Sequence, residues 1–164
     1  MRSQLILDPK DTVLVIIDIQ EKLFRTIEGR LDIEKNAIKA IKLAHVFCMP
    51  IIVTEQYPKG LGPTIPALAK EIGRFEPIIK TEYSAFGQAP FICALEATGR
   101  KSIMLIGIEA HICVTQTALD AMANGYKVHA VSDAVGSSKE KSKDIGIGRM
   151  QQAGAVEARH TDGG

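Results

Sequence analysis

The sequence predicts a protein of the α/β class, a three-layer α/β/α sandwich around a six-stranded, mainly parallel sheet. Short aliphatic runs alternate with stretches of helical spacing, and this alternation implies parallel strands joined by right-handed crossovers. The runs are continuous and rich in β-branched residues, as in strands covered on both faces. Of the 164 residues, 46% are hydrophobic and 24% are charged, which is the mixture of an ordinary globular protein. We expect residues 1–164 to form one domain.

Six aliphatic runs are the expected strands, and the last of them is the weakest. They are Thr12–Ile17, Ile51–Thr54, Glu76–Lys80, Ser102–Ile106, Lys127–Val131 and Ala155–Arg159. Helices are expected between them. Ile33, Ala37 and Ile41 recur at four-residue steps, which places them on one face of a helix. The segments Phe91–Thr98 and Val114–Ala123 have similar spacing. Stop signals follow the helical stretches at Gly99, Asn124-Gly125 and Gly154.

The segment Gln56–Arg74 departs from this alternation because it contains three prolines and three glycines. We interpret it as a long loop with a short helix. It is either a lid over a site or a plain surface connection.

Composition excludes several classes of function. Twenty Lys and Arg against nineteen Asp and Glu give a net charge of +1, which argues against a nucleic-acid groove and a polybasic membrane anchor. The N-terminus has no long apolar run of the signal-peptide type. Three widely spaced cysteines form no CxxC pair, so neither a zinc knuckle nor a disulfide framework is indicated. A cytoplasmic protein with reduced cysteines is expected.

Three reactive side chains follow the ends of predicted strands. Asp18 ends the first strand, Lys80 ends the third, and Cys113 opens the helix after the fourth. Ligands of parallel sheets bind outside the carboxyl ends of the strands, so these groups should meet there. We expect Lys80 and the helix N-terminus to lower the pKa of Cys113, and Asp18 to accept its proton. Taken singly, each residue has a structural alternative: a cap, a solvated strand end or a small buried hydrophobe.

Several segments resemble the isochorismatase-like cysteine hydrolase superfamily. They are Thr12–Gln20, Lys80–Phe86, Gly107–Val114 and Val128–Ala134. The resemblance extends from Thr12 to about Ala155 and is closest to the isochorismatase domain-containing protein group, through Thr54–Gly60 and Gly107–His111. It implies a Rossmann-like fold and an Asp–Lys–Cys catalytic triad, carried onto Asp18, Lys80 and Cys113.

The resemblance also implies a cis peptide between Ile108 and Glu109, with the N–H groups of Glu109 and Cys113 forming an oxyanion hole. The implied reaction is hydrolysis of the C–N bond of a small amide through a thioester, without a cofactor. The substrate pocket would include side chains near the triad. The candidates are Gln20, Tyr57, Tyr83 and Phe86.

Relatives that bind a metal carry an Asp-x-His pair after the second strand, whereas this chain has Thr54–Pro58 there, with no histidine. We therefore expect no metal. Glu55 either acts alone near the site or, as we interpret it, is a solvated loop acid. The resemblance implies a homo-oligomer, a dimer or tetramer. The short C-terminal end, His160–Gly164, is either frayed or supported by a partner subunit. Two other functions stay open: an isochorismatase-type ether hydrolase, which would not need Cys113, and a catalytically idle oligomeric binding protein.

Overall fold

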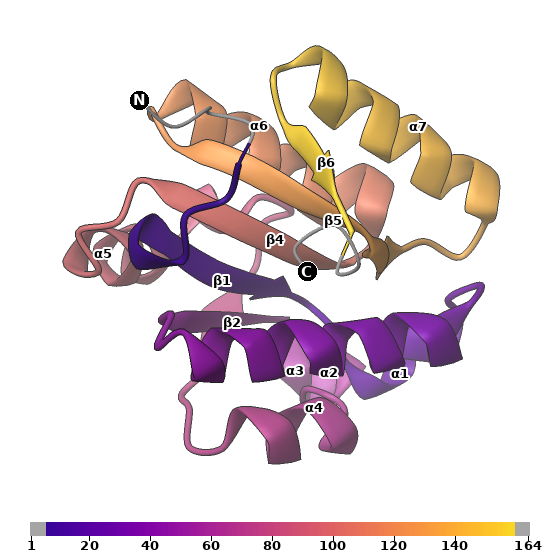
Figure 1. The fold of residues 1–164 in the computed structure, drawn as a ribbon. Helices are drawn as coiled ribbons and strands as arrows, with labels where there is room; N and C mark the ends of the chain where they lie inside the picture. Colours follow the sequence, from indigo (N-terminus) through magenta and orange to yellow (C-terminus); the bar gives the residue numbers. More distant parts are fainter. Residues whose placement is uncertain (1–5, 160–164) are drawn as a thin grey trace.

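A computed structural model describes residues 6–159 of the chain (Figure 1). Its six strands form one parallel sheet in the order β3-β2-β1-β4-β5-β6. The strands are β1 (Thr12–Ile17), β2 (Ile51–Gln56), β3 (Ile78–Lys80), β4 (Ser102–Ile108), β5 (Lys127–Gly136) and β6 (Val156–Ala158). The predicted α/β class and parallel sheet are confirmed. The first strand has the predicted bounds, while β5 runs five residues further than expected.

Helices cover both faces of the sheet. The longer ones are α2 (Arg30–Val46), α5 (Ala89–Ala97), α6 (Thr115–Ala123) and α7 (Glu140–Gln152). The short ones are α1 (Glu21–Phe24), α3 (Pro58–Leu61) and α4 (Pro66–Ile72). In Figure 1, α2 and α4 lie on one side of the sheet and α6 and α7 on the other, which gives the expected three layers.

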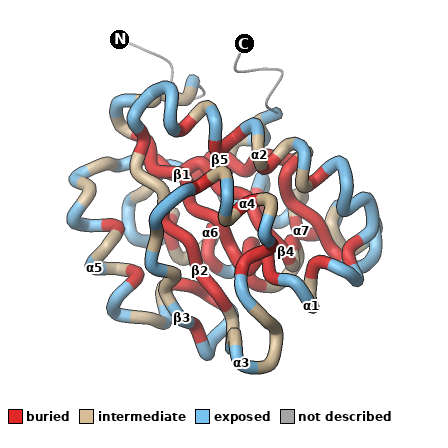
Figure 2. Tube along the Cα trace, turned by 90° about the horizontal axis from the view of Figure 1, so that it is seen from below, coloured by how far each residue is buried: buried red, intermediate tan, exposed pale blue. Residues whose placement is uncertain are grey.

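The central strand β1 explains why the sheet is buried on both faces. Leu14 and Ile16 pack with α2 and α4, whereas Val13, Val15 and Ile17 pack with α5, α6 and α7. Alternate side chains of a strand point to opposite faces, so a strand between two helical layers must be apolar throughout. All six residues of β1 are buried, and the central strands β1, β2, β4 and β5 are mostly red in the tube of Figure 2.

The segment Gln56–Arg74 is more ordered than the sequence predicted. It contains two short helices, α3 and α4, and each begins with a proline at its first position. This position suits proline because the N–H there has no partner within the helix. Leu68 and Ile72 of α4 are buried against α2. The α4 part of the segment is therefore a piece of the core, not a lid.

None of the helices within residues 6–159 has the length and apolar character needed to cross a lipid bilayer. The segment His160–Gly164 lies outside the described residues.

Candidate active site

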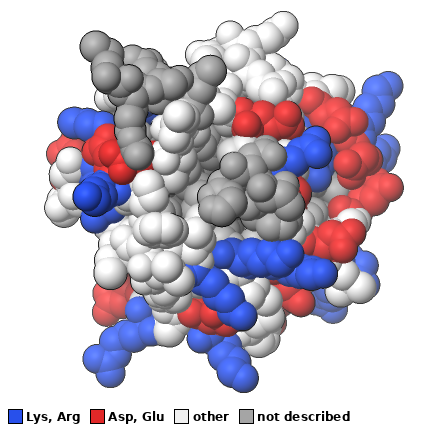
Figure 3. All heavy atoms as spheres, viewed as in Figure 1, with Lys and Arg blue, Asp and Glu red and all other residues white. Residues whose placement is uncertain are grey.

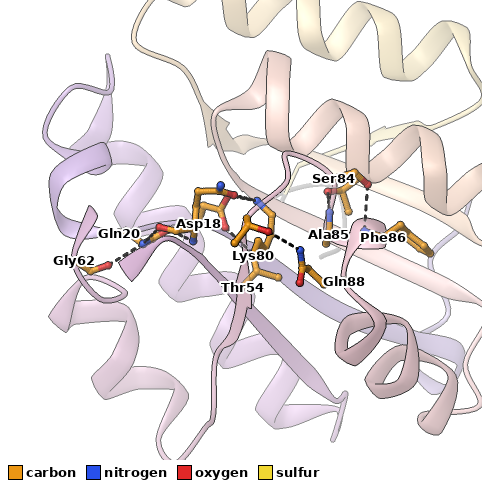
Figure 4. Close-up of polar contacts among 12 residues, drawn as sticks. Asp18, Gln20, Thr54, Gly62, Lys80, Ser84, Ala85, Phe86 and Gln88 are labelled. Atoms are coloured by element: carbon orange, nitrogen blue, oxygen red, sulfur yellow. Dashed lines mark hydrogen bonds and ion pairs between the residues drawn. The ribbon is translucent and has the colours of Figure 1, made fainter. Parts of the chain in front are cut away.

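A buried ion pair lies at the carboxyl ends of the strands. Lys80 Nζ is 2.6 Å from Asp18 Oδ2, and both side chains are 0% exposed (Figure 4). Asp18 follows β1 directly and has a φ of 52°, a left-handed conformation that Asp adopts more readily than most residues. A buried charge needs a partner, so each of these groups accounts for the burial of the other.

Strand β2 separates the two members of the pair. Adjacent strands lie about 4.8 Å apart, so the side chains of β1 and β3 must together span about 10 Å. Two β2 residues support this span: Thr54 donates its hydroxyl to Asp18 Oδ1 at 2.8 Å, and Lys80 Nζ donates to Gln56 Oε1 at 2.8 Å. Sequence reasoning missed both residues. The order of the strands would have pointed to them, because it places β2 between β1 and β3 and makes Gln56 the register partner of Lys80.

The third residue, Cys113, lies in a single π-helical turn, Ala110–Val114, between β4 and α6. Its side chain is buried, and both Asp18 and Lys80 lie near enough to shift the pKa of its thiol. The structure thus brings together the three residues that the sequence singled out, although 62 and 33 positions separate them along the chain (80 − 18 and 113 − 80).

The expected direction of the Cys113 pKa was wrong. Burial and the nearby Asp18 carboxylate raise the pKa of Cys113 from 9.0 to about 12, and the opposing effect of Lys80 is smaller. The expectation rested on Lys80 and the helix N-terminus, and it left out both the desolvation of the thiol and the effect of the Asp18 carboxylate on its pKa. At neutral pH the resting site therefore holds a neutral thiol beside a carboxylate, and a thiolate forms only when its proton moves.

Helix α7 packs closely against the turn that carries Cys113. The Ile108–Glu109 peptide bond is cis, and the N–H groups of Ile112 and Val114 both donate to the Glu109 carbonyl at 3.2 Å. Gly146 of α7 lies so near that a Cβ there would be 2.7 Å from the carbonyl oxygen of Ala110. Only a glycine lets α7 approach this turn so closely.

Side chains tie the same turn to the segment after β5. His111 Nδ1 is 3.0 Å from Ser137 Oγ and 3.8 Å from Glu109 Oε2. Glu109 Oε1 also accepts from the N–H of Ser138 at 2.9 Å. These contacts tie the side chains of Glu109 and His111 to Ser137 and Ser138, so both side chains are placed to position the turn.

Two polar residues from the sequence analysis have other surroundings than expected. Gln20 is fully buried, and its amide bonds three backbone groups, those of Gly62 O, Gln56 O and Gln56 N, at 2.7–2.9 Å. It joins β1 to β2 and to the segment around α3. Glu55 is not a solvated loop acid: it is 5% exposed, and its Oε2 accepts from the N–H and hydroxyl of Thr64.

A cavity of about 710 Å³ adjoins the ion pair. Its lining residues are Gln56, Thr81, Glu82, Tyr83, Ser84, Phe86, Gly87, Gln116 and Asp120. Tyr83 and Phe86, two of the four expected pocket residues, are among them, whereas Gln20 and Tyr57 are not. Tyr57 is 59% exposed on the loop that leads into α3.

Within residues 6–159, no three side chains of His, Cys, Asp or Glu are grouped closely enough to hold a metal ion. The other two cysteines of the chain, Cys48 and Cys93, are free and exposed, so neither packs in the core.

Comparison with known families gives one consistent result. A model of the isochorismatase domain matches residues 12–162. Isochorismatase family protein 1A of Dictyostelium discoideum is 39% identical over 169 residues, covering 94% of this chain and 77% of that protein. Human isochorismatase domain-containing protein 2 is 37% identical over 150 residues, covering 90% and 70%.

Solved structures agree in fold. The MAR1 ribonuclease of Caenorhabditis elegans is 36% identical, with a TM-score of 0.88 over 95% of this chain and 80% of that one. The YcaC gene product of Escherichia coli, described as an octameric hydrolase of unknown specificity, is 27% identical with a TM-score of 0.92 over 99% and 82%. YcaC of Pseudomonas aeruginosa, solved with hexane-2,5-diol and covalent acrylamide, is 26% identical with a TM-score of 0.89 over 96% and 80%.

Proposed function

The chain belongs to the isochorismatase family, and on this premise we propose that it is a cysteine-dependent hydrolase that cleaves the C–N bond of a small amide. The observation that carries the proposal is the convergence of Asp18, Lys80 and Cys113 from three separate segments, with the ion pair closed at 2.6 Å and fully buried. Ionisable side chains that converge at one buried site beside a cavity are typical of reaction centres.

In the first stage, the sulfur of Cys113 attacks the carbonyl carbon while its proton passes to Asp18. The raised pKa of Cys113 makes this coupling necessary, because a free thiolate is scarce at neutral pH. The tetrahedral intermediate collapses, the C–N bond breaks, and Asp18 returns the proton to the departing ammonia or amine. A thioester on Cys113 remains.

In the second stage, water attacks the thioester while Asp18 accepts one of its protons. The C–S bond breaks, Asp18 gives the proton to the leaving sulfur, and the acid departs with the thiol restored. Throughout both stages Lys80 holds its positive charge beside Asp18, which keeps the carboxylate in place. We assign the developing oxyanion to the N–H groups of Glu109 and Cys113, because Ser138 holds the Glu109 side chain and α7 packs on the turn that contains Cys113.

The test is a panel of small primary amides assayed for ammonia release, followed by mass spectrometry of the acid-quenched enzyme. We expect an acyl group on Cys113 and no turnover by Cys113→Ala. Asp18→Asn should lower kcat by about 10²–10⁴-fold, the usual contribution of a general base. Turnover that survives Cys113→Ala would instead favour the ether-hydrolase alternative. No reaction with any amide, and no acyl adduct, would favour the idle binding protein.

Acrylamide is a useful first probe because it joins an amide group to a thiol-reactive carbon. The Pseudomonas aeruginosa relative was solved with covalent acrylamide. If the site here accepts small amides, acrylamide should modify Cys113 in the native protein, and Asp18→Asn should slow that modification.

A second function, RNA cleavage, is favoured by the 36% identity to the worm MAR1 ribonuclease. Against it, Glu82 and Asp120 line the cavity and would repel phosphate. Basic and acidic side chains also lie next to one another on the face shown in Figure 3. Incubation with labelled RNA, with Cys113→Ala as the control, separates the two functions.

We further propose a homo-oligomer, supported by the description of the Escherichia coli relative as octameric. A cytoplasmic location and a single domain over residues 1–164 stay predictions from the sequence.

A further inference from the structure

The cavity beside the ion pair is connected to the triad through three of its lining residues. Gln56 accepts a hydrogen bond from Lys80. Phe86 packs against the buried cluster that contains Cys113. Gln116 lies three residues after Cys113, about one helical turn further along the same segment. These three residues connect the cavity to the triad, although Cys113 itself is not one of its lining residues.

The side chains that line the cavity include negative charges but no positive ones. Two carboxylates, Glu82 and Asp120, and two aromatic rings, Tyr83 and Phe86, contribute to it, and its nine residues include no Lys, Arg or His. The whole chain is almost neutral, at +1, so this local excess of negative charge is not a general property of the protein. Carboxylates combined with aromatic faces attract organic cations.

The carboxylate of Asp120 is held in place. Its Oδ2 accepts the hydroxyl of Ser84 at 2.6 Å, and Ser84 itself is 8% exposed. The same loop is tied to α6 a second time, because the N–H of Ala85 donates to Thr117 Oγ1 at 3.0 Å. Figure 4 shows Ser84 on the loop that follows Lys80. A fixed carboxylate can distinguish substrates by charge, since it loses little freedom when a cation binds.

The spacing sets the size of the molecule. Asp120 lies seven residues after Cys113, which corresponds to about 10 Å along a helix. The Asp120 side chain and its hydrogen bond occupy part of that span, which leaves room for about five bonds between a carbonyl carbon and a charged nitrogen.

We infer that the cavity selects amides with a positively charged amine at the far end of the acyl chain, about five bonds from the carbonyl. Glu82 and Asp120 bind the ammonium group, and Tyr83 and Phe86 enclose its methylene chain. The inference rests on the proposed amide hydrolysis, because that places the carbonyl at Cys113.

Three amides of nearly equal length test it: 5-aminopentanamide, hexanamide and the monoamide of adipic acid, which are cationic, neutral and anionic. For the wild-type protein we expect kcat/KM to be about tenfold higher for the cation than for the neutral amide, and lowest for the anion. Asp120→Asn, which keeps an oxygen for Ser84, and Glu82→Gln should each reduce that ratio about threefold or more. Asp144→Asn removes an exposed charge on α7 and should leave the ratio unchanged. Equal rates for the three amides, or equal effects of Asp120→Asn and Asp144→Asn, would overturn the inference.

A binding measurement separates this inference from the proposed reaction. If no amide is hydrolysed, the three compounds are titrated calorimetrically into the Cys113→Ala variant. Tighter binding of 5-aminopentanamide than of hexanamide then supports selection of a cation by the cavity, although the proposed amide hydrolysis fails. Binding without any preference for the cation overturns the inference itself.

Discussion

Replacing Gly146 by alanine tests whether α7 presses on the turn that carries Cys113. An added Cβ would lie 2.7 Å from the carbonyl oxygen of Ala110, and 2.9 Å from both its carbonyl carbon and the Cα of His111. Carbon atoms in contact normally lie about 3.5–4.0 Å apart, so the two backbones must separate by more than half an ångström. All three atoms belong to the main chain and cannot rotate away.

Gly148 is a matched control in the same helix, because a Cβ there meets nothing within 4 Å. At either position the change to alanine gains up to about 1 kcal/mol of helix propensity. Only at Gly146 does overpacking oppose that gain, at a typical cost of about 1–3 kcal/mol. Gly146→Ala should therefore be less stable than Gly148→Ala by about 1–3 kcal/mol.

The two variants are compared by thermal unfolding and by activity. For a chain of this length, that difference in stability separates the melting temperatures by about 2–12 °C. Gly146→Ala should also lower kcat, since the displaced turn carries the thiol and one of the two proposed oxyanion donors, the N–H of Cys113. Equal melting temperatures and equal rates would refute the close packing of α7 on this turn.

Three other changes give independent predictions. Lys80→Met leaves the buried Asp18 carboxylate without its charged partner and should lower the free energy of unfolding in urea by about 3–5 kcal/mol. Lys143→Met, which removes a longer and more exposed ion pair, should lower it by less than about 1 kcal/mol. Similar losses of stability in the two variants would contradict the burial of the Lys80–Asp18 pair. Burial lowers the pKa of His129 below its usual 6.5, so on acidification His129 is protonated in the unfolded chain before it is protonated in the folded one. The free energy of unfolding should therefore fall as the pH drops below about 6.5, by up to about 1.4 kcal/mol per pH unit. His129→Gln should flatten that slope, and an unchanged slope would assign it to other groups. Near neutral pH, iodoacetate, which carries no amide group, should label the two exposed cysteines before Cys113, whose thiol is buried and has a raised pKa. Labelling of Cys113 first would contradict the raised pKa.

The sequence predicted the sheet well because each strand carries its own signal. The residues Val13–Ile17 are apolar throughout, which identifies a strand buried on both faces, and Asp18 directly after it marks the reactive edge. Lys80 was found in the same way. These inferences need only local pattern and the rule that parallel strands present their carboxyl ends together.

The features that could not be predicted from the sequence depend on contacts between distant segments. Gln56 supports Lys80 only because β2 lies between β1 and β3, and the order of strands cannot be read from one segment. Gly146 stands in an ordinary helical stretch, and its role appears only when α7 packs on the turn after β4. The direction of the Cys113 pKa needed the depth of burial, which is a property of the assembled fold.

The place of Lys80 in the sheet gives the site an early point of failure. It ends β3, an edge strand of only three residues, whereas Asp18 follows the fully buried β1. Edge strands with few paired residues open at a lower free energy than the centre of a sheet. In rising denaturant, fraying of this edge would withdraw the ammonium group while the rest of the molecule stays folded, so inactivation would precede global unfolding.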